Sequence, residues 1–565
     1  MPEPTRPLRD PRPNLDGSLT THSVATPVAF RIRGAVYVGS RRVIPVMFVP
    51  GMMGTNLRVR RDVALPENHP LEPGEAAWRP PNGDYDSWHY ADLWKERSPA
   101  VRQMILHPDL VEVDDGGELD IDACRLHPDD MRERGWGQLF NGAYGHLLYE
   151  LQSHLDLTFR HDALGKRHVR SYWKDVMLAM QGDTLARWGV RSVAPLTEAE
   201  LERFARYQYP IYCFGYNWLR SCGESAQLLQ RRIETIIAWW QARKHQCSKV
   251  ILVTHSMGGL VARACAKRIP DKIAGVVHGM MPALGAPLAY RRLACGTECD
   301  NPANGMLDNY RAGKFADISG RTTEETTPVL AASVGALELL PNHLYPRPWL
   351  HIGVKHRSGS KEILTEYLQF PGEAAPNPYD FYRDMKSWYR LINPALVDPA
   401  RLYESKKKDA RAVVNDALLT AEHFHRWLGD YYHPTTFAYY GHDQERPAYS
   451  HIHWSARVHQ TSTSVSLTSH GIQRAGYLVH DADGTRTVEV DGMHILSFSV
   501  APQDASGDDT VSHQSGAAPA GKIKQLFAVR GHRHQDSFRE RDALLLTRYC
   551  IVKIVQELER HEPKK

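Results

Sequence analysis

The chain has 565 residues and a formal net charge of +4, and 24% of its residues are charged. This length predicts about three or four domain-sized units and a large core. The nearly balanced charge gives no indication of a nucleic-acid partner, and no apolar run reaches the ~18 residues of a transmembrane helix.

Residues 1–26 are polar and rich in proline, and we expect them to form a disordered tail. The first seven residues lack the apolar segment of a Sec signal peptide. We therefore expect the protein to stay in the cytoplasm of the producing cell unless another machine exports it. Cys295 and Cys299 are close enough to pair, but eight cysteines in a chain this long favour free thiols.

Apolar, strand-like runs alternate with helical patterns over much of the chain. The runs 43–49 and 249–254 are rich in β-branched residues, as in strands that are buried on both faces. Alternating strands and helices predict an α/β fold with a mostly parallel central sheet covered by helices. The predicted strands are 28–38, 43–49, 210–216, 249–254, 273–278, 435–441, 477–480, 487–490 and 527–529, and the predicted helices are 136–155, 228–240, 378–392, 409–430 and 543–558.

Three segments interrupt this alternation. Residues 78–130 are polar and punctuated by Pro and Gly, which predicts an insertion of loops and short helices. Residues 291–430 are rich in Pro, Tyr and Trp and predict an inserted cap or lid. Residues 456–500 predict a β-hairpin excursion. We therefore expect the core in two parts, 27–290 and 431–560.

Residues 249–263 combine a buried strand, a tight turn and the start of a helix. The turn Thr254-His255-Ser256-Met257-Gly258 differs by one residue from the G-x-S-x-G nucleophile elbow. In such a turn the serine has a strained backbone, so the residues two before and two after it must be small. Gly258 meets this requirement, and Thr254 is larger than the usual Gly but compact. A chance serine in an ordinary strand–turn–helix is the alternative, but the strand and the helix favour Ser256 as a nucleophile.

A nucleophilic serine needs donors for the oxyanion that forms during attack. The backbone N–H of the residue after the nucleophile, here Met257, is the first candidate. The second candidate is Met52, because it lies in the Gly-rich turn 50–56 that directly follows the strand 43–49. A plain tight turn is the other interpretation of this segment.

The serine also needs a base, and the base needs an orienting carboxylate. In hydrolases with a nucleophile elbow the order along the chain is Ser, acid, His. His532 and His534 both follow the last predicted strand. Asp508 and Asp443 both occupy suitable positions for the acid, and position alone does not separate them.

Five short motifs occur in order along the chain: Val49-Pro50-Gly51-x-x-Gly54, Tyr216-Asn217-Trp218, His255-Ser256-Met257-Gly258-Gly259, Leu339-Leu340-Pro341 and Gly507-Asp508-Asp509-Thr510-Val511. Together they resemble the lecithin–cholesterol acyltransferase group and related bacterial lipases. The resemblance implies an α/β-hydrolase fold in which the acid is the first Asp of G-D-x-T-V. It therefore favours Asp508 over Asp443, with Asp509 as a neighbour. The base of the group is the His of a G-x-x-H stretch. This His corresponds to His534 here, and His532 is the alternative.

Two further stretches, 283–292 and 531–537, resemble antibacterial lipase effectors of type VI secretion that have a PGAP1-like hydrolase core. This resemblance implies a serine esterase of phospholipase A type that acts on membrane glycerophospholipids. It implies no cofactor, an immunity protein and a secretion-machine component as partners, and delivery as a toxin to the periplasm or membrane of a rival cell. A neutral-lipid esterase or acyltransferase, or a non-catalytic binding protein with a hydrolase fold, is the alternative.

Histidines and aspartates of the last quarter raise the question of a bound metal. His451, His453 and His459 invite a zinc interpretation, but no carboxylate or Cys lies at ligand spacing near them, so we expect no metal site. Residues 481–484 resemble the start of a calcium loop, but the distal Glu of an EF-hand is missing. A hairpin turn is the better interpretation of this segment.

Overall fold

The computed structural model describes residues 40–82, 84–120, 123–161, 166–301, 304–358, 361–458, 467–480 and 484–561, together with four short strands before residue 36. The tail expected at 1–26 lies outside the described residues, apart from β1 (Thr5–Pro7), β2 (Arg12–Pro13) and β3 (Leu19–Thr20). Of the strand predicted at 28–38, only β4 (Arg33–Ala35) is described. His459 and the tip of the turn at 481–484 also lie outside the described residues.

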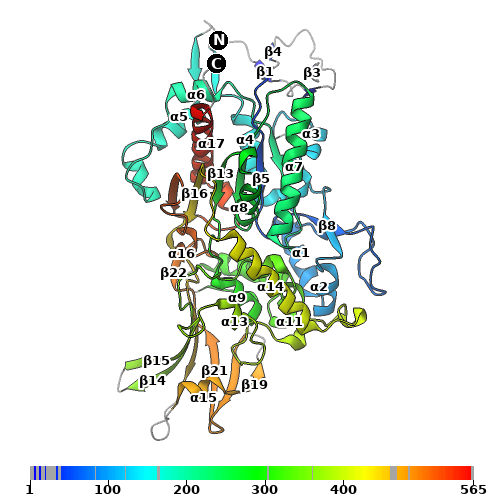
Figure 1. Ribbon diagram of the computed structural model, residues 1–565, viewed down its shortest axis with the longest axis vertical. Coiled ribbons are helices and arrows are strands. Elements are labelled where there is room, and N and C mark those ends of the chain that lie inside the picture. Colours follow the sequence, from blue (N-terminus) through cyan, green and yellow to red (C-terminus); the bar gives the residue numbers. More distant parts are fainter. Residues whose placement is uncertain are drawn as a thin grey trace.

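A parallel sheet of six strands forms the centre of the molecule (Figure 1). All five neighbouring pairs in this sheet run parallel. The predicted parallel sheet is therefore present, and its strands correspond to six of the predicted strands. In spatial order they are β11 (Ile211–Cys213), β5 (Val46–Val49), β12 (Val250–His255), β13 (Ile273–Gly279), β16 (Thr436–Gly441) and β23 (Gln525–Val529).

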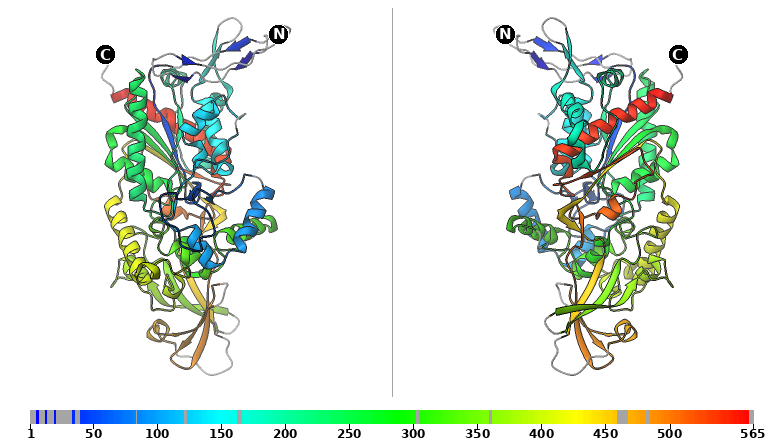
Figure 2. Two further views of the ribbon diagram at one scale, coloured as in Figure 1. Left: turned by 90° about the vertical axis from the view of Figure 1, so that its right-hand side faces the viewer. Right: turned by 90° about the vertical axis from the view of Figure 1, so that its left-hand side faces the viewer.

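Both faces of the central sheet are buried. Successive side chains of a strand point to opposite faces, so each strand contributes to two apolar clusters. In β5, Met47 and Val49 pack in one apolar cluster, and Val46 and Phe48 pack in the other. The first cluster includes apolar residues of α7 (Cys222–Ala242) and α8 (Gly258–Arg268), and the second those of α4 (Asn141–His154) and α17 (Arg541–His561). Figure 2 shows α7 and α17 on opposite sides of the sheet.

A second six-stranded sheet lies at the end of the molecule opposite to both termini (Figure 1). It joins strands from the segment expected as a cap with strands from the segment expected as a hairpin excursion, so these two segments form one body. In spatial order its strands are β15 (Lys361–Phe370), β14 (Leu350–Ser358), β18 (Ile452–Arg457), β21 (His494–Val500), β20 (Arg486–Val490) and β19 (Gly476–His480).

The hairpin of β14 and β15 was not predicted from the sequence, and one helix predicted in the same segment is shorter in the structure. The outer strand β15 is largely exposed, so its sequence lacks an apolar run. The helix predicted at 378–392 ends after α13 (Pro378–Tyr382). The carboxylate of Asp384 accepts hydrogen bonds from the backbone N–H groups of Lys386 and Ser387, which forms a turn and stops the helix.

The insertion at 78–130 packs against the cap. Helix α1 (Asp84–Lys95) contacts α10 (Met306–Ser319), and α2 (Pro99–Ile105) contacts α11 (Thr323–Leu330). The guanidinium of buried Arg102 donates to the carbonyl oxygens of Asp317 and Ile318 at the end of α10. In Figure 2, α1 and α10 lie side by side at one flank of the molecule.

The remaining elements are short or connect these parts. Among the described residues, no helix combines the length and apolar character needed to cross a membrane. The remaining strands are β6 (Leu57–Val59), β7 (Ala76–Trp78), β8 (Val111–Val113), β9 (Phe159–His161), β10 (Arg167–Val169), β17 (Asp443–Ala448) and β22 (Ala505–Gly507), and the remaining helices are α3 (Pro128–Glu133), α5 (Ser171–Ala179), α6 (Glu198–Phe204), α9 (Pro287–Cys295), α12 (Val334–Leu337), α14 (Ala410–Leu428), α15 (Ser469–Gln473) and α16 (His513–Gly516).

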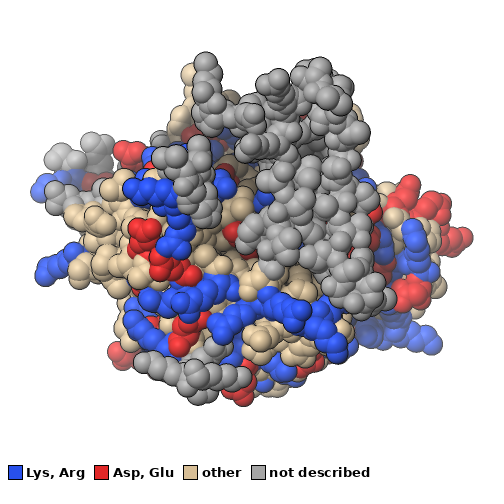
Figure 3. All heavy atoms as spheres, turned by 90° about the horizontal axis from the view of Figure 1, so that it is seen from above, with Lys and Arg blue, Asp and Glu red and all other residues tan. Residues whose placement is uncertain are grey.

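All eight cysteines are free thiols, with Cys295 buried and Cys299 exposed, as expected. Charged side chains of both signs occur on the face seen from the end that carries the termini. Figure 3 shows a band of Lys and Arg across this face with Asp and Glu beside it. The visible part of this face therefore has a mixed charge.

Candidate active site

Ser256 occupies a sharp turn between β12 and α8. Its φ angle is 51°, in the left-handed region that side chains other than Gly rarely adopt. Such a conformation costs of order 1–3 kcal/mol and persists only where neighbouring structure enforces it. Here the backbone N–H of Ser256 donates to the carbonyl of Gly279 at 3.0 Å, which anchors the turn to β13. The turn has the conformation of a nucleophile elbow.

The residues around Ser256 explain why Gly occupies position 258 and how Thr, in place of the usual Gly, fits at position 254. A Cβ at position 258 would lie 2.4 Å from the carbonyl oxygens of Val49 and Pro50, so only Gly lets α8 approach β5 this closely. The larger Thr254 is accommodated because its hydroxyl is hydrogen-bonded to buried His278 at 2.8 Å. The substitution of Thr for Gly therefore does not open the turn.

Three of the predicted site residues lie in one chain of hydrogen bonds. The Oγ of Ser256 is 2.8 Å from Nε2 of His534, and Nδ1 of His534 is 2.9 Å from Oδ2 of Asp508. The other carboxylate oxygen of Asp508 accepts the N–H groups of Thr510 and Val511. This arrangement can transfer the Ser256 proton to His534 while Asp508 holds the ring.

The three side chains meet at the edge of the central sheet where its parallel strands end. Ser256 follows β12, and His534 lies in the loop after β23. Asp508 belongs to a later excursion but packs against the end of β16, where a Cβ on Gly441 would lie 2.5 Å from the Asp508 Cβ. The carboxyl ends of parallel strands are the usual place for sites in such sheets.

Burial and charge set the protonation of the site. Burial opposes the charged form of His534, but the charge and the hydrogen bond of Asp508 outweigh it and raise the pKa of the imidazole. The pKa of the neighbouring Asp509 is also raised, which is unfavourable for a carboxylate that has to be ionised to orient the base. Desolvation and repulsion from Asp508 raise the pKa of Asp509 to about 7.

The two rival candidates lie elsewhere in the same region. The carboxylate of Asp443 accepts the backbone N–H groups of Gly531 and Glu445, so it shapes the loop that carries His534. His532 is buried, and its Nδ1 has no hydrogen-bond partner among the described residues. Its burial lowers the pKa of its imidazole.

The two backbone groups predicted to hold an oxyanion lie beside Ser256. Met257 follows it directly at the start of α8, and the turn containing Met52 passes so close that a Cβ on Gly51 would lie 2.9 Å from the Ser256 Cβ. Among the described residues, neither backbone N–H of this pair has a hydrogen-bond acceptor. Their role as oxyanion donors stays a prediction.

The sequence analysis missed two buried residues that support the site. Nε2 of His255 lies 2.9 Å from the carbonyl oxygen of His534, and its Nδ1 lies 2.8 Å from the Tyr144 hydroxyl. Because the carbonyl can only accept, Nε2 carries the proton and Nδ1 accepts from Tyr144. The Tyr144 oxygen in turn accepts the N–H of Gly51 at 3.2 Å. Burial lowers the pKa of His255 and keeps it neutral.

His255 and Tyr144 thus connect the turn at Gly51 with the loop of His534. His255 could have been noticed because it precedes Ser256. Tyr144 gave no signal beyond its place in a helical apolar pattern. His255 and Tyr144 hold segments of the backbone in position, and neither contacts a reacting atom.

The site is closed in this structure. Ser256 is 8% exposed and His534 is 7% exposed. An ionic contact joins the cap to the site, since the carboxylate of Asp308 on α10 pairs with Arg533, the neighbour of His534, and with Arg446 at 3.4 Å. The same helix exposes apolar side chains, of which Met306 is 93% and Leu307 59% exposed.

Comparisons with known proteins agree with the fold. Residues 219–316, which contain α7, β12, Ser256, α8, β13 and α9, match the family described as PGAP1-like alpha/beta domain. A chain in the crystal structure of the Tle4–Tli4 complex is 29% identical, covers 91% of this chain and 98% of its own length, and superposes with a TM-score of 0.73.

Other comparisons are weaker. The crystal structure of DbjA is 14% identical over 61% of this chain and 78% of its own length, with a TM-score of 0.23, which is too low to support an argument. The comparison with curated proteins gave no match. The chain has an α/β-hydrolase fold, and its residues 219–316, around Ser256, are similar to the PGAP1-like alpha/beta domain family.

Proposed function

We propose that this protein is a serine esterase that hydrolyses acyl esters of membrane glycerophospholipids. The observation that carries the proposal is the continuous hydrogen bonding from Ser256 through His534 to Asp508. A strained serine at the end of a buried strand, with a base and a buried carboxylate in line, is the arrangement that activates a hydroxyl for attack.

In the first half-reaction, Nε2 of His534 takes the proton of Ser256 as Oγ attacks the ester carbonyl carbon. Asp508 keeps the proton on Nδ1, so that Nε2 is free to act as the base. The carbonyl oxygen gains negative charge, and the N–H groups of Met52 and Met257 donate to it. Collapse of this intermediate breaks the ester C–O bond, and His534 gives its proton to the departing lysolipid.

The second half-reaction removes the acyl group from Ser256. A water molecule takes the place of the lysolipid, gives a proton to His534 and attacks the acyl carbon. The fatty acid leaves, and His534 returns the proton to Ser256. All proton transfers use His534, and no step requires a cofactor.

The substrate assignment draws on observations other than those for the chemistry. It rests on the resemblance to lipases and to type VI effectors in the sequence and on the similarity to a chain of the Tle4–Tli4 complex. Exposed apolar side chains on α10 next to a closed site suit a lipid surface as the place of action. The complex of Tle4 with Tli4 supports a protein partner for this chain, and from the sequence resemblance we propose that this partner is an immunity protein.

A lipid assay separates this proposal from its alternatives. Vesicles of mixed phospholipids, incubated with the purified protein, should release free fatty acid and lysophospholipid in equal amounts. Release from triglyceride alone would favour a neutral-lipid esterase, and acyl transfer to an added alcohol without release of acid would favour an acyltransferase. No turnover and no labelling by a fluorophosphonate probe would favour a binding protein.

Ser256→Ala is the control for this assay. The change removes Oγ from a small buried side chain, so we expect the fold and the Tm to persist while hydrolysis and probe labelling disappear. Labelling that survives in the variant would place the nucleophile elsewhere.

Delivery as an antibacterial toxin is tested separately. We expect little toxicity when the chain is made in the bacterial cytoplasm and strong toxicity when a periplasmic signal is fused to its N-terminus. Ser256→Ala should remove that toxicity. A fusion that accumulates, hydrolyses esters in the extract and leaves growth unchanged would contradict the toxin role and leave the esterase proposal intact.

A further inference from the structure

Five titratable side chains gather in the second sheet, away from Ser256. They come from three strands and the segments next to them, and more than 150 positions of sequence separate the first from the last. Two overlapping groups of possible metal ligands share one histidine. The first group is His351, Glu366 and His453, and the second is His451, His453 and Asp504.

Strand register brings the two histidines of the first group together. β14 and β18 are parallel neighbours, and His351 is paired directly with His453. Paired residues of neighbouring strands project on the same face. The two imidazole rings are stacked with centroids 4.7 Å apart and planes 22° apart.

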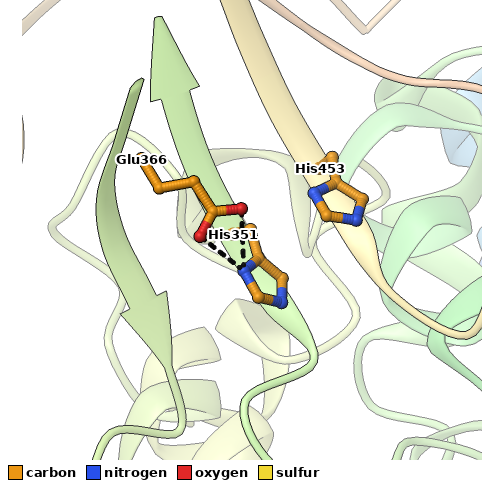
Figure 4. Close-up of side chains that lie close together, drawn as sticks. All are labelled: His351, Glu366 and His453. Carbon is orange, nitrogen blue, oxygen red and sulfur yellow. Dashed lines mark hydrogen bonds and ion pairs between the residues drawn. The ribbon is translucent and has the colours of Figure 1, made fainter. Parts of the chain in front are cut away.

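A β-bulge brings the carboxylate to the same place. The register of β14 against β15 shifts between Ile352 and Gly353, so that Gly353 is paired with Glu366. Because Gly353 is two residues from His351, Glu366 projects on the face that carries both histidines. Its two carboxylate oxygens lie 3.4 Å from Nδ1 of His351. Figure 4 shows the three side chains converging from three strands.

We propose that His351, Glu366 and His453 bind a zinc-class divalent transition-metal ion. Two imidazoles and one carboxylate are a ligand set that such ions prefer, whereas Ca²⁺ and Mg²⁺ prefer oxygen ligands alone. Ligand atoms of a tetrahedral ion with bonds of about 2.0–2.1 Å lie about 3.3 Å apart. The 3.4 Å between Glu366 and His351 meets this separation, and all three ligand atoms lie within 4.8 Å of one another.

The second group is less suited to bind the ion by itself. Nδ1 of His451 and Oδ2 of Asp504 are 2.6 Å apart, which is a hydrogen-bond distance and too short for two ligands of one ion. Asp504 also accepts the backbone N–H groups of Ser450 and His451. We therefore assign His451 and Asp504 to the surroundings of the site, where Oδ2 of Asp504 lies 4.0 Å from Nε2 of His453 and the ring of His451 lies beside that of His453.

This site revises the expectation that the chain holds no metal. That expectation rested on the lack of a carboxylate near His451 and His453 in the sequence. Glu366 supplies the carboxylate from 87 positions before His453, across a strand pairing that local sequence patterns do not reveal. A bound ion would connect β15, β14 and β18 and so hold the cap segment to the later excursion.

The test is zinc binding by the full-length protein with any affinity tag removed. The protein is stripped with EDTA and dialysed, titrated with Zn²⁺ by calorimetry, and analysed for metal content. We expect one tightly bound Zn²⁺ per chain and a rise of the Tm when Zn²⁺ is added. Failure of the wild type to take up a stoichiometric ion would overturn the proposal.

Variants identify the ligands. Glu366→Gln keeps the shape of the side chain and His453→Ala removes the shared histidine, and both should lose the stoichiometric site and the Zn²⁺-dependent rise of the Tm. His423→Ala, an exposed histidine of α14, is the matched control and should bind as the wild type does. Circular dichroism of the metal-free variants checks that each is folded. Equal uptake by Glu366→Gln and the control would refute the site.

A last pair of variants separates the two overlapping groups. His351→Ala should abolish the site, whereas His451→Ala should weaken it by about 10–100-fold, as expected for a residue in the surroundings of the ligands. The reverse order would overturn the assignment of ligands in favour of His451, His453 and Asp504. Neither result depends on the esterase activity.

Discussion

Each of the two six-stranded sheets combines strand pairs that are close in sequence with pairs that are distant, and the two candidate sites use different kinds of pair. In the central sheet, β12 and β13 are neighbours in sequence and space, and one helix connects them. In the second sheet, β14 pairs with β18 about a hundred residues later. The first kind of pairing follows from local strand and helix patterns, whereas the second depends on how the whole chain folds.

The two candidate sites differ in the same way, because one begins from a local motif and the other from a long-range strand pairing. Ser256 lies in a continuous strand–turn–helix that the sequence alone identifies. The cluster at His351 and His453 is built from residues that are unremarkable in their own segments. A residue placed by one motif, such as Ser256, can therefore be found in a sequence, whereas contacts between distant segments, such as that of Ser256 with His534 or of His351 with His453, require the tertiary structure. The following predictions test the first site and its connection to the cap, from the largest effect to the smallest.

Asp508→Asn should have the largest effect short of removing the nucleophile. It leaves the shape of the side chain but favours the wrong His534 tautomer, which costs about 10⁴-fold in kcat in comparable triads. Steady-state hydrolysis of a short-chain ester measures it. Asp443→Asn is the matched control, because Asp443 accepts N–H groups of the loop and does not contact His534, and its effect should be mild. The opposite ranking would make Asp443 the functional acid.

Tyr144→Phe should lower kcat about tenfold with little change in KM. The variant removes the hydroxyl that donates to His255 and accepts the Gly51 N–H, and it leaves both buried groups without a partner, at about 1–3 kcal/mol each. Tyr149→Phe on the same helix is the control and should keep full activity. Equal kcat values with a lowered Tm for Tyr144→Phe would limit its role to stability.

Asp308→Asn should raise activity on a dissolved short-chain ester several-fold. The change removes the ionic contact of α10 with Arg533 and Arg446, so the cap opens more often. The wild type should show a sharp rise of rate at the micellar concentration of the substrate, and the variant a smaller one. Asp416→Asn, on the exposed side of α14, is the control. A smooth hyperbola for the wild type would contradict a mobile cap.

The pH dependence should give the smallest effect. His534 must be neutral to accept the Ser256 proton, and its pKa is raised by Asp508, so kcat/KM should rise with pH through a pKa above the usual value of about 6.5. The pH–rate profile of Asp508→Asn, measured on its residual activity, should have this limb at lower pH. An unmoved limb would mean that Asp508 does not set the pKa of His534.

The same shift has a consequence for stability. Since the folded state favours the protonated imidazole, His534 contributes to stability below the unfolded pKa of about 6.5. This contribution is lost as the pH rises through the raised folded pKa. Thermal unfolding of wild type and Asp508→Asn over this pH range should therefore differ most at the acidic end.

The sequence by itself determined the class of fold and the nucleophile candidate. Buried β-branched runs such as 249–254 predict strands because both faces of a parallel sheet are covered, and Gly258 after Ser256 indicates the elbow. It did not choose between Asp508 and Asp443, for which a family resemblance was needed. Asp443 comes just after the strand 435–441 and Asp508 comes after the excursion 456–500, and no local pattern says which of the two contacts His534.

Only the tertiary structure decided the contacts between distant segments. It brought Tyr144 and His255 behind the Ser256 site, joined Asp308 to Arg533, and aligned His351 with His453. These contacts depend on strand register and helix packing across a hundred or more residues. The burial of whole faces of sheets and helices selects such pairings. The sequence around a single residue therefore does not indicate which distant residue it will contact.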